Sequence, residues 1–220
     1  MQKLQYLEIA RGMAALLVVL HHATLGAPVF YNAEPFYNFF LFGSAGVDFF
    51  FVLSGFIIYY IHSDDQNSWT AIKKYILKRI IRIYPAFLLV SLVLLGAYLT
   101  FPQWSPRGDL INMQYLTDSL LLLPSSQRPL LTVGWTLVHE MFFYTVFIVV
   151  ILNKKIGVSL LWGWGLLILL ANVYIVKLDF PSSFYLNAHN LEFLLGMGVA
   201  YLIKSSTIEW TSERERELCR

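Results

Sequence analysis

The chain has 220 residues, of which 57% are hydrophobic and only 14% are charged, with a formal net charge of +2. Soluble domains average roughly 45–50% apolar and about 25% charged residues. Together with a mean hydropathy of +0.60, this composition excludes a disordered chain, a nucleic-acid-binding module and a soluble globule. It indicates a polytopic membrane protein, and the lipid bilayer is one of its expected partners.

Six segments are long and apolar enough to cross a bilayer, because ~30 Å of hydrocarbon requires about 20 helical residues. The predicted spans cover residues 10–29, 39–61, 83–101, 133–152, 156–176 and 188–203. The first is interpreted as an uncleaved span, since Leu25 stands where a signal-peptide cleavage site needs a small residue. The segment 113–123 is apolar but too short to cross, and we expect it to be re-entrant or interfacial.

Lysine and arginine gather in the connections 62–82 and 153–155 and near both termini. If the N-terminus is cytoplasmic, only Arg107, Arg128 and Lys177 fall outside. Cytoplasmic connections are enriched in these residues, so both termini are predicted to be cytoplasmic. The predicted fold class is therefore all-α. A transmembrane helix bundle of about six spans occupies residues 1–204, followed by a polar cytoplasmic tail, residues 205–220.

Ionisable side chains inside apolar spans are costly and mark candidate sites. In the first span, Arg11 and His22 are eleven residues apart, so they differ by about 20° around a helix and lie ~16 Å apart along it. They share one face. The adjacent His21 points about 100° away and is interpreted as structural.

Asp48 in the second span and Glu140 in the fourth complete the candidate site. Counted from the outer ends of their spans at ~1.5 Å per residue, both lie about 10–14 Å deep, and His22 comes to about the same level. Each group alone could serve only helix packing, but three acid–base groups at one level favour chemistry. Other ionisable residues also fall in the outer half: His139, interpreted as structural, His189 and Glu192.

Arg79 and Arg82 stand at positions i and i+3 on one face, shortly before Pro85. Cytoplasmic topology alone explains the neighbouring Lys73, Lys74 and Lys78. Two adjacent guanidinium groups, however, suit the bidentate binding of a phosphate. A phosphate-bearing ligand on the cytoplasmic side is therefore predicted.

Four motifs follow one another along nearly the whole chain: the Arg11–His22 spacing, GVDFFFVLSGF at 46–56, KRIIRIYP at 78–85 and WTLVHEMFFY at 135–144. In order and spacing they resemble the acyltransferase-3 family of integral membrane O-acyltransferases. The segment LEFLLG at 191–196 is also similar to a late segment of that family. Two features depart from the pattern: Thr136 stands where Ser is commoner, and the six spans are fewer than the family usually has. The chain is thus expected to be a short or C-terminally truncated member.

The resemblance implies transfer of an acyl group, usually acetyl, from cytoplasmic acyl-CoA to a hydroxyl of a surface glycan or similar acceptor. It implies that Arg11 and His22 form the functional pair of the first span, and that Arg79 and Arg82 bind the acyl donor. It also makes Glu140 the functional carboxylate of the motif in which a glutamate follows Trp135 by five residues.

We expect the CoA phosphates to bind Arg79 and Arg82, with Arg11 in support. His22 is expected to act as general base, with Glu140 or Asp48 orienting its ring. No metal is expected, because the neighbouring His21 and His22 cannot face one ion from a regular helix.

The expected location is a multi-pass integral membrane protein, in the plasma (inner) membrane if the source is bacterial. Two other interpretations stay open. Intramembrane His, Asp and Glu also build proton-coupled transporters, and a truncated chain could be a non-catalytic remnant. The residues 102–132 outside the membrane are the expected contributors to acceptor recognition.

Overall fold

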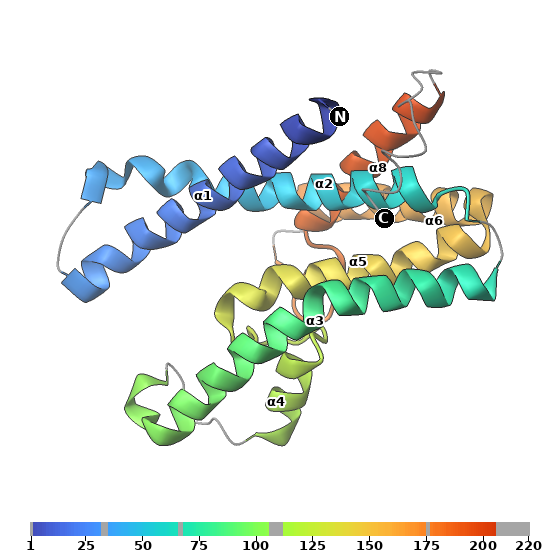
Figure 1. The fold of residues 1–220 in the computed structure, drawn as a ribbon. Coiled ribbons are helices and arrows are strands. Elements are labelled where there is room, and N and C mark those ends of the chain that lie inside the picture. Colours follow the sequence, from blue (N-terminus) through green and yellow to red (C-terminus); the bar gives the residue numbers. More distant parts are fainter. Residues whose placement is uncertain (1, 32–34, 66–67, 106–111, 175–176, 206–220) are drawn as a thin grey trace. The chain divides into compact units, whose positions relative to one another are not determined.

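The computed structural model describes residues 2–31, 35–65, 68–105, 112–174 and 177–205 (Figure 1). Every regular element in these ranges is helical, which confirms the predicted all-α class. The elements in chain order are α1 (Gln2–Tyr31), η1 (Pro35–Ser44), α2 (Ala45–His62), α3 (Trp69–Thr100), η2 (Pro102–Trp104), α4 (Met113–Leu120), η3 (Thr132–Gly134), α5 (Trp135–Leu152), α6 (Lys154–Tyr174), α7 (Ser182–Tyr185) and α8 (His189–Ser205).

Among the described residues, five helices are long and apolar enough to cross a membrane: Tyr6–Pro28, Phe39–His62, Trp69–Thr100, Thr132–Leu152 and Lys154–Tyr174. The predicted sixth span corresponds to α8, which has 17 residues. At 1.5 Å per residue it is ~26 Å long, a little short of the hydrocarbon thickness. The predicted segment 113–123 contains the eight-residue helix α4, also too short to cross. Most of the predicted tail, residues 206–220, lies outside the described residues.

The third span begins earlier than its sequence suggested. Helix α3 starts at Trp69, where the Ser68 hydroxyl accepts a hydrogen bond from the backbone N–H of Ala71 and caps the helix. The prediction placed the start at Ile83 because the basic run resembles a connection. Lysine and arginine are good helix formers, however, and no glycine or proline interrupts residues 69–82. The basic run is therefore part of the helix itself.

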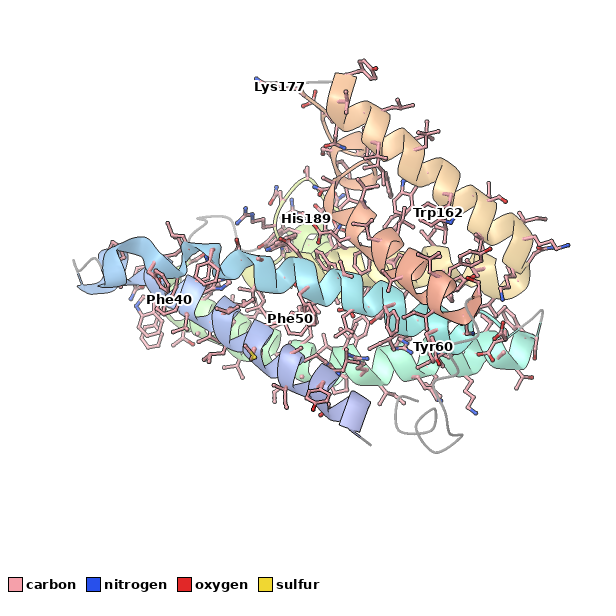
Figure 2. The ribbon with its side chains drawn as sticks, turned by 90° about the horizontal axis from the view of Figure 1, so that it is seen from above. Phe40, Phe50, Tyr60, Trp162, Lys177 and His189 are labelled. Atoms are coloured by element: carbon pink, nitrogen blue, oxygen red, sulfur yellow. The ribbon has the colours of Figure 1, made fainter. Side chains whose placement is uncertain are left out.

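Large apolar side chains cover the outer surface of the helices. Helix α6 exposes a series of them (Leu160, Trp162, Leu166, Leu167 and Leu170), and Figure 2 labels Trp162 on this helix. Helices α1 and α3 carry similar exposed residues. A soluble monomer rarely exposes such continuous apolar surface. In lipid this surface is favourable, so the burial pattern agrees with an integral membrane protein.

The chain forms two compact units, one from residues 1–62 and 191–220, the other from residues 63–190. In the first unit, glycines bring η1 and α2 against α1. A Cβ atom on Gly43 would collide with the backbone carbonyl of Leu17, and one on Gly46 would lie 2.5 Å from that of Ala14. Gly43 thus faces a later part of α1 than Gly46 does, so the two segments run antiparallel. Figure 2 labels Phe40 on η1 and Phe50 on α2 along this course.

Helices α2 and α8 of the same unit contact each other through a second pair of glycines. A Cβ atom on Gly55 would collide with the Phe193 carbonyl, and one on Gly196 would collide with the Val52 carbonyl. The rings of Phe51 and Phe193 lie 4.7 Å apart. Asp48 lies beside Glu192 near the start of both helices, and the rings of Tyr59 and Tyr201 lie 6.4 Å apart nearer their ends, so α2 and α8 run parallel. Glycines at helix contacts let backbones approach closely in membranes, where dispersion replaces the hydrophobic effect.

In the second unit, α5 and α6 form a helical hairpin. The Asn153 side chain accepts a hydrogen bond from the Ile156 N–H at 3.1 Å and caps α6, while Gly157 lets the backbone of Val150 approach closely. Lys154 forms an ion pair with Asp64 at 2.8 Å. Helix α3 packs beside α5, as Figure 1 shows.

The connection after α3 is attached to that helix by a tyrosine. The Tyr84 hydroxyl donates to the Leu121 carbonyl at 2.8 Å, just after α4 ends. The buried Ser119 hydroxyl accepts from the Leu130 N–H at 3.1 Å. These two bonds hold the chain between α4 and α5 in place although neither α4 nor η3 is long.

The glycine contact between α2 and α8 can be tested by adding a methyl group. Gly196→Ala should lower the free energy of unfolding by about 1–3 kcal/mol, the usual cost of overpacking, because its Cβ meets backbone that cannot rotate away. Gly163→Ala is the matched control, since nothing lies within 4 Å of its added Cβ. That change should be neutral or stabilise by about 0.5–1 kcal/mol through helix propensity. Thermal unfolding in detergent measures both, and equal midpoints would contradict the close contact.

Candidate functional site

The six predicted site residues divide between the two units. The first unit holds Arg11, His22 and Asp48, and the second holds Arg79, Arg82 and Glu140. Arg11, His22, Asp48 and Glu140 occupy the spans that the sequence assigned to them, in α1, α2 and α5. Arg79 and Arg82, predicted in a connection, lie within helix α3. The chemistry open to each predicted site residue depends on its contacts within its own unit.

The His22 ring is oriented by its own helix. Its Nδ1 lies 2.8 Å from the Val18 carbonyl oxygen, one turn earlier in α1. A carbonyl can only accept a hydrogen bond, so Nδ1 is the donor, and in the neutral ring Nε2 keeps its lone pair. The side chain is exposed on the surface of α1. His22 therefore presents Nε2 as a base, with a backbone carbonyl, rather than a carboxylate, at the other ring nitrogen.

His21 has a different role. Its Nδ1 lies 2.9 Å from the carbonyl oxygen of Leu41 in η1. The bond ties α1 to the segment that leads into α2. This contact agrees with the structural role expected for His21.

Asp48 does not lie at the level of His22. The antiparallel register sets Gly46 against Ala14, so Asp48, two residues later in α2, lies at the level of Gly12, about ten residues or ~15 Å before His22 along α1. The predicted common level of these two groups was wrong, because it assumed that the outer ends of both spans lie at one level. Instead, Leu41, near the start of the second span, lies beside His21, well before the end of α1.

A second carboxylate lies beside Asp48. Carboxylate oxygens of Asp48 on α2 and Glu192 on α8 are within 4.8 Å of each other. The parallel register of these helices produces this pair.

Arg79 is buried in the second unit, with a relative exposure of 6%. Its guanidinium carbon lies 5.7 Å from the ring centre of Tyr75, one turn earlier in α3, and 5.4 Å from that of Tyr144 in α5. The negative π faces of two buried tyrosines compensate part of its charge. The Tyr75 hydroxyl also donates to the Tyr144 carbonyl at 3.1 Å, which links the two helices.

Glu140 belongs to the same group. The Tyr144 hydroxyl donates a hydrogen bond to a Glu140 carboxylate oxygen one turn earlier in α5. The charges of Arg79, Arg82 and Glu140 all lie near enough to interact electrostatically with the Tyr144 hydroxyl. We call Tyr75, Arg79, Glu140 and Tyr144 the Arg79 cluster. It brings Glu140, a predicted catalytic residue, together with Arg79, one of the two predicted donor-binding arginines.

His139 is a buried structural group, in agreement with its interpretation from sequence. Its Nδ1 lies 2.9 Å from the Asn190 side-chain oxygen, and its ring stacks on Phe184 at 4.4 Å. The Asn190 amide in turn donates to the carbonyls of Phe184 and Tyr185. These bonds fold the α7 segment against α5.

Sequence reasoning missed the two tyrosines of the Arg79 cluster. Tyr144 ends the motif at 135–144 without a role predicted for it, and no motif includes Tyr75. Both carry a spacing signal, because Tyr75 precedes Arg79 by four residues and Tyr144 follows Glu140 by four. Side chains four apart in a helix are neighbours. The contact between the two pairs depends on how α3 packs against α5, which the sequence does not state.

These features define a class of protein: a polytopic helical membrane protein with an exposed histidine on one span and a buried arginine–tyrosine–glutamate cluster on two others. A family model described as an acyltransferase domain matches residues 4–212. The match covers nearly the whole chain. The chain belongs to the acyltransferase-3 family, which confirms the resemblance drawn from the motifs.

The chain is similar to the exopolysaccharide production protein ExoZ of Rhizobium meliloti (strain 1021). The two are 31% identical over 178 residues, which cover 77% of this chain and 54% of the relative. The chain thus spans about half the length of the curated relative it matches. No solved structure matches the chain.

The different burial of the two arginines leads to a stability test. Arg79→Ala should lower the free energy of unfolding by about 2–4 kcal/mol, because it leaves a carboxylate and two tyrosines without their buried cation. Arg82 is exposed, so Arg82→Ala should change it by no more than about 0.5 kcal/mol. Thermal unfolding of the purified variants in one detergent compares them. Equal losses would mean that the Arg79 cluster does not stabilise the fold.

Proposed function

We propose that the chain is a membrane acyltransferase that moves an acyl group, most simply acetyl, from acyl-CoA to a hydroxyl of an extracytoplasmic glycan. The observation that carries the proposal is the His22 geometry in a chain of this family. A histidine with Nδ1 bound to a carbonyl and Nε2 exposed suits a general base. The ExoZ name supports an exopolysaccharide as the acceptor class.

The donor end of the proposal rests on the arginines. Arg82 is exposed beside the buried Arg79, and a guanidinium binds phosphate oxygens through parallel charge-assisted hydrogen bonds. We propose that this side of α3 faces the cytoplasm, where it binds the phosphates of acyl-CoA, with Arg11 of α1 in support. The proposed location is the plasma membrane, the inner one in a bacterium.

The proposed reaction is a direct transfer. His22 Nε2 removes the proton of the acceptor hydroxyl as the hydroxyl oxygen forms a bond to the thioester carbonyl carbon. The carbon–sulfur bond then breaks, and its electron pair leaves with the CoA sulfur. His22 returns the proton to that sulfur, so the products are an acyl ester and free CoA.

A proton-coupled transporter is a second candidate. The Asp48–Glu192 pair favours it, because paired carboxylates inside spans bind and release protons in such proteins. Labelled acyl group on a glycan would support the transferase. Proton-coupled uptake without acyl transfer would support the transporter, and neither activity in a stably inserted chain would indicate a non-catalytic remnant.

The base is tested with the two neighbouring histidines. His22→Ala should abolish transfer of labelled acetyl from acetyl-CoA to an added exopolysaccharide fraction, because no base remains for the hydroxyl. His21→Gln is the control, since glutamine retains a donor for the Leu41 carbonyl. Membrane insertion of both variants is checked by extraction in detergent. Normal transfer by His22→Ala would remove His22 from the mechanism.

Donor binding gives an independent test. Arg82→Ala should weaken acetyl-CoA binding to the purified chain by about tenfold or more, because a hydrogen bond to a charged group contributes about 1.5–3 kcal/mol. Raising the salt concentration should weaken wild-type binding as well. Lys73→Ala, which removes a charge two turns away on the same helix, is the control. If Arg82→Ala bound acetyl-CoA like wild type, this arginine would have no place in the donor site.

A further inference from the structure

The two arginines of α3 differ in what they can reach. Arg82 is exposed and can meet a ligand in solution. Arg79 is only 6% exposed, and both Tyr75 and Tyr144 lie against its guanidinium group. A phosphate group that bound Arg79 directly would have to enter this buried site and displace an aromatic ring. The pair is therefore unlike a symmetric phosphate clamp.

Tyr144 contacts every other member of the Arg79 cluster. Its ring faces the Arg79 guanidinium, its hydroxyl donates to Glu140, and its backbone carbonyl accepts from the Tyr75 hydroxyl. The side chain is itself buried, at 3% exposure. A residue held at its ring, its hydroxyl and its backbone has little freedom to turn. It fixes the Glu140 carboxylate relative to the buried cation.

We infer that Tyr144 is a positioning residue that couples Glu140 to Arg79, while Arg82 alone of the arginine pair contacts the acyl donor. The inference rests on the proposed function, which it deepens by dividing the work of the two arginines. Arg79 supplies a fixed buried charge. Through Tyr144 that charge holds the Glu140 carboxylate in one orientation, and Arg82 remains available for phosphate.

Tyr144→Phe tests the coupling because it removes only the hydroxyl and keeps the ring over Arg79. We expect kcat for acetyl transfer to fall by about tenfold or more, the effect of losing a hydrogen bond to a charged group. The dissociation constant of acetyl-CoA should stay within about twofold of wild type, because a lost positioning contact lowers kcat without weakening ground-state binding. Arg82→Ala should show the reverse pattern. Tyr98→Phe, on α3, is the control for loss of a tyrosine hydroxyl.

Two results would overturn the inference. If Tyr144→Phe weakened acetyl-CoA binding as much as Arg82→Ala does, Tyr144 would belong to the donor site itself. If Tyr144→Phe kept the wild-type kcat, the hydroxyl would position nothing. A purely structural role would not lower kcat while leaving acetyl-CoA binding unchanged, so measuring kcat and binding separately distinguishes it from a positioning role.

A second measurement does not depend on activity. Thermal unfolding of Tyr144→Phe, Glu140→Gln and the double variant forms a cycle, and contacting residues give non-additive effects. We expect the double variant to lose less melting temperature than the sum of the single losses. Additive losses would contradict the coupling. If wild type bound acetyl-CoA but transferred no acetyl group, the proposed function would be overturned. The unfolding cycle would then still decide whether Tyr144 and Glu140 are coupled.

Discussion

A buried positive charge constrains the second unit more than any other group. The Arg79 guanidinium lies in an apolar bundle where an uncompensated cation is very costly. Tyr75 is one turn from Arg79, and Glu140 is one turn from Tyr144, so each helix supplies two members of the cluster. Their contacts require α3 and α5 to pack in one register. The charge that is costly to bury thereby specifies how the two helices meet.

In the first unit the register of the helices is set by small residues and not by a buried charge. Glycines at its helix contacts remove side chains from between the backbones, as at Gly46 and Gly196. No hydrophobic driving force favours helix association in lipid, so such close approach gains stability from dispersion. The register that results also places Asp48 beside Glu192. Packing by small residues thus decides which ionisable groups meet.

Sequence predicted what depends on composition and local spacing. The helical class, the membrane environment, the family motifs and the structural interpretation of His139 all follow from residue types and periodicity. Sequence failed where tertiary register decides: it put Asp48 at the level of His22, and it gave Tyr144 no role. The start of α3 was misplaced for a related reason, because a basic run looks the same in a connection and in a helix that extends beyond the apolar stretch.

The length of α3 makes this protein sensitive to the thickness of its membrane. Its 32 residues extend over ~48 Å, against ~30 Å of hydrocarbon. The apolar part begins at Ile83, so Arg79 stands one turn before it. A thicker or thinner bilayer changes helix tilt and costs fractions of a kcal/mol per Å of mismatch. Lipid composition would then shift the depth of Arg79 and of Arg82, the arginine inferred to contact the acyl donor, so hydrophobic mismatch becomes a physical input to the proposed donor site.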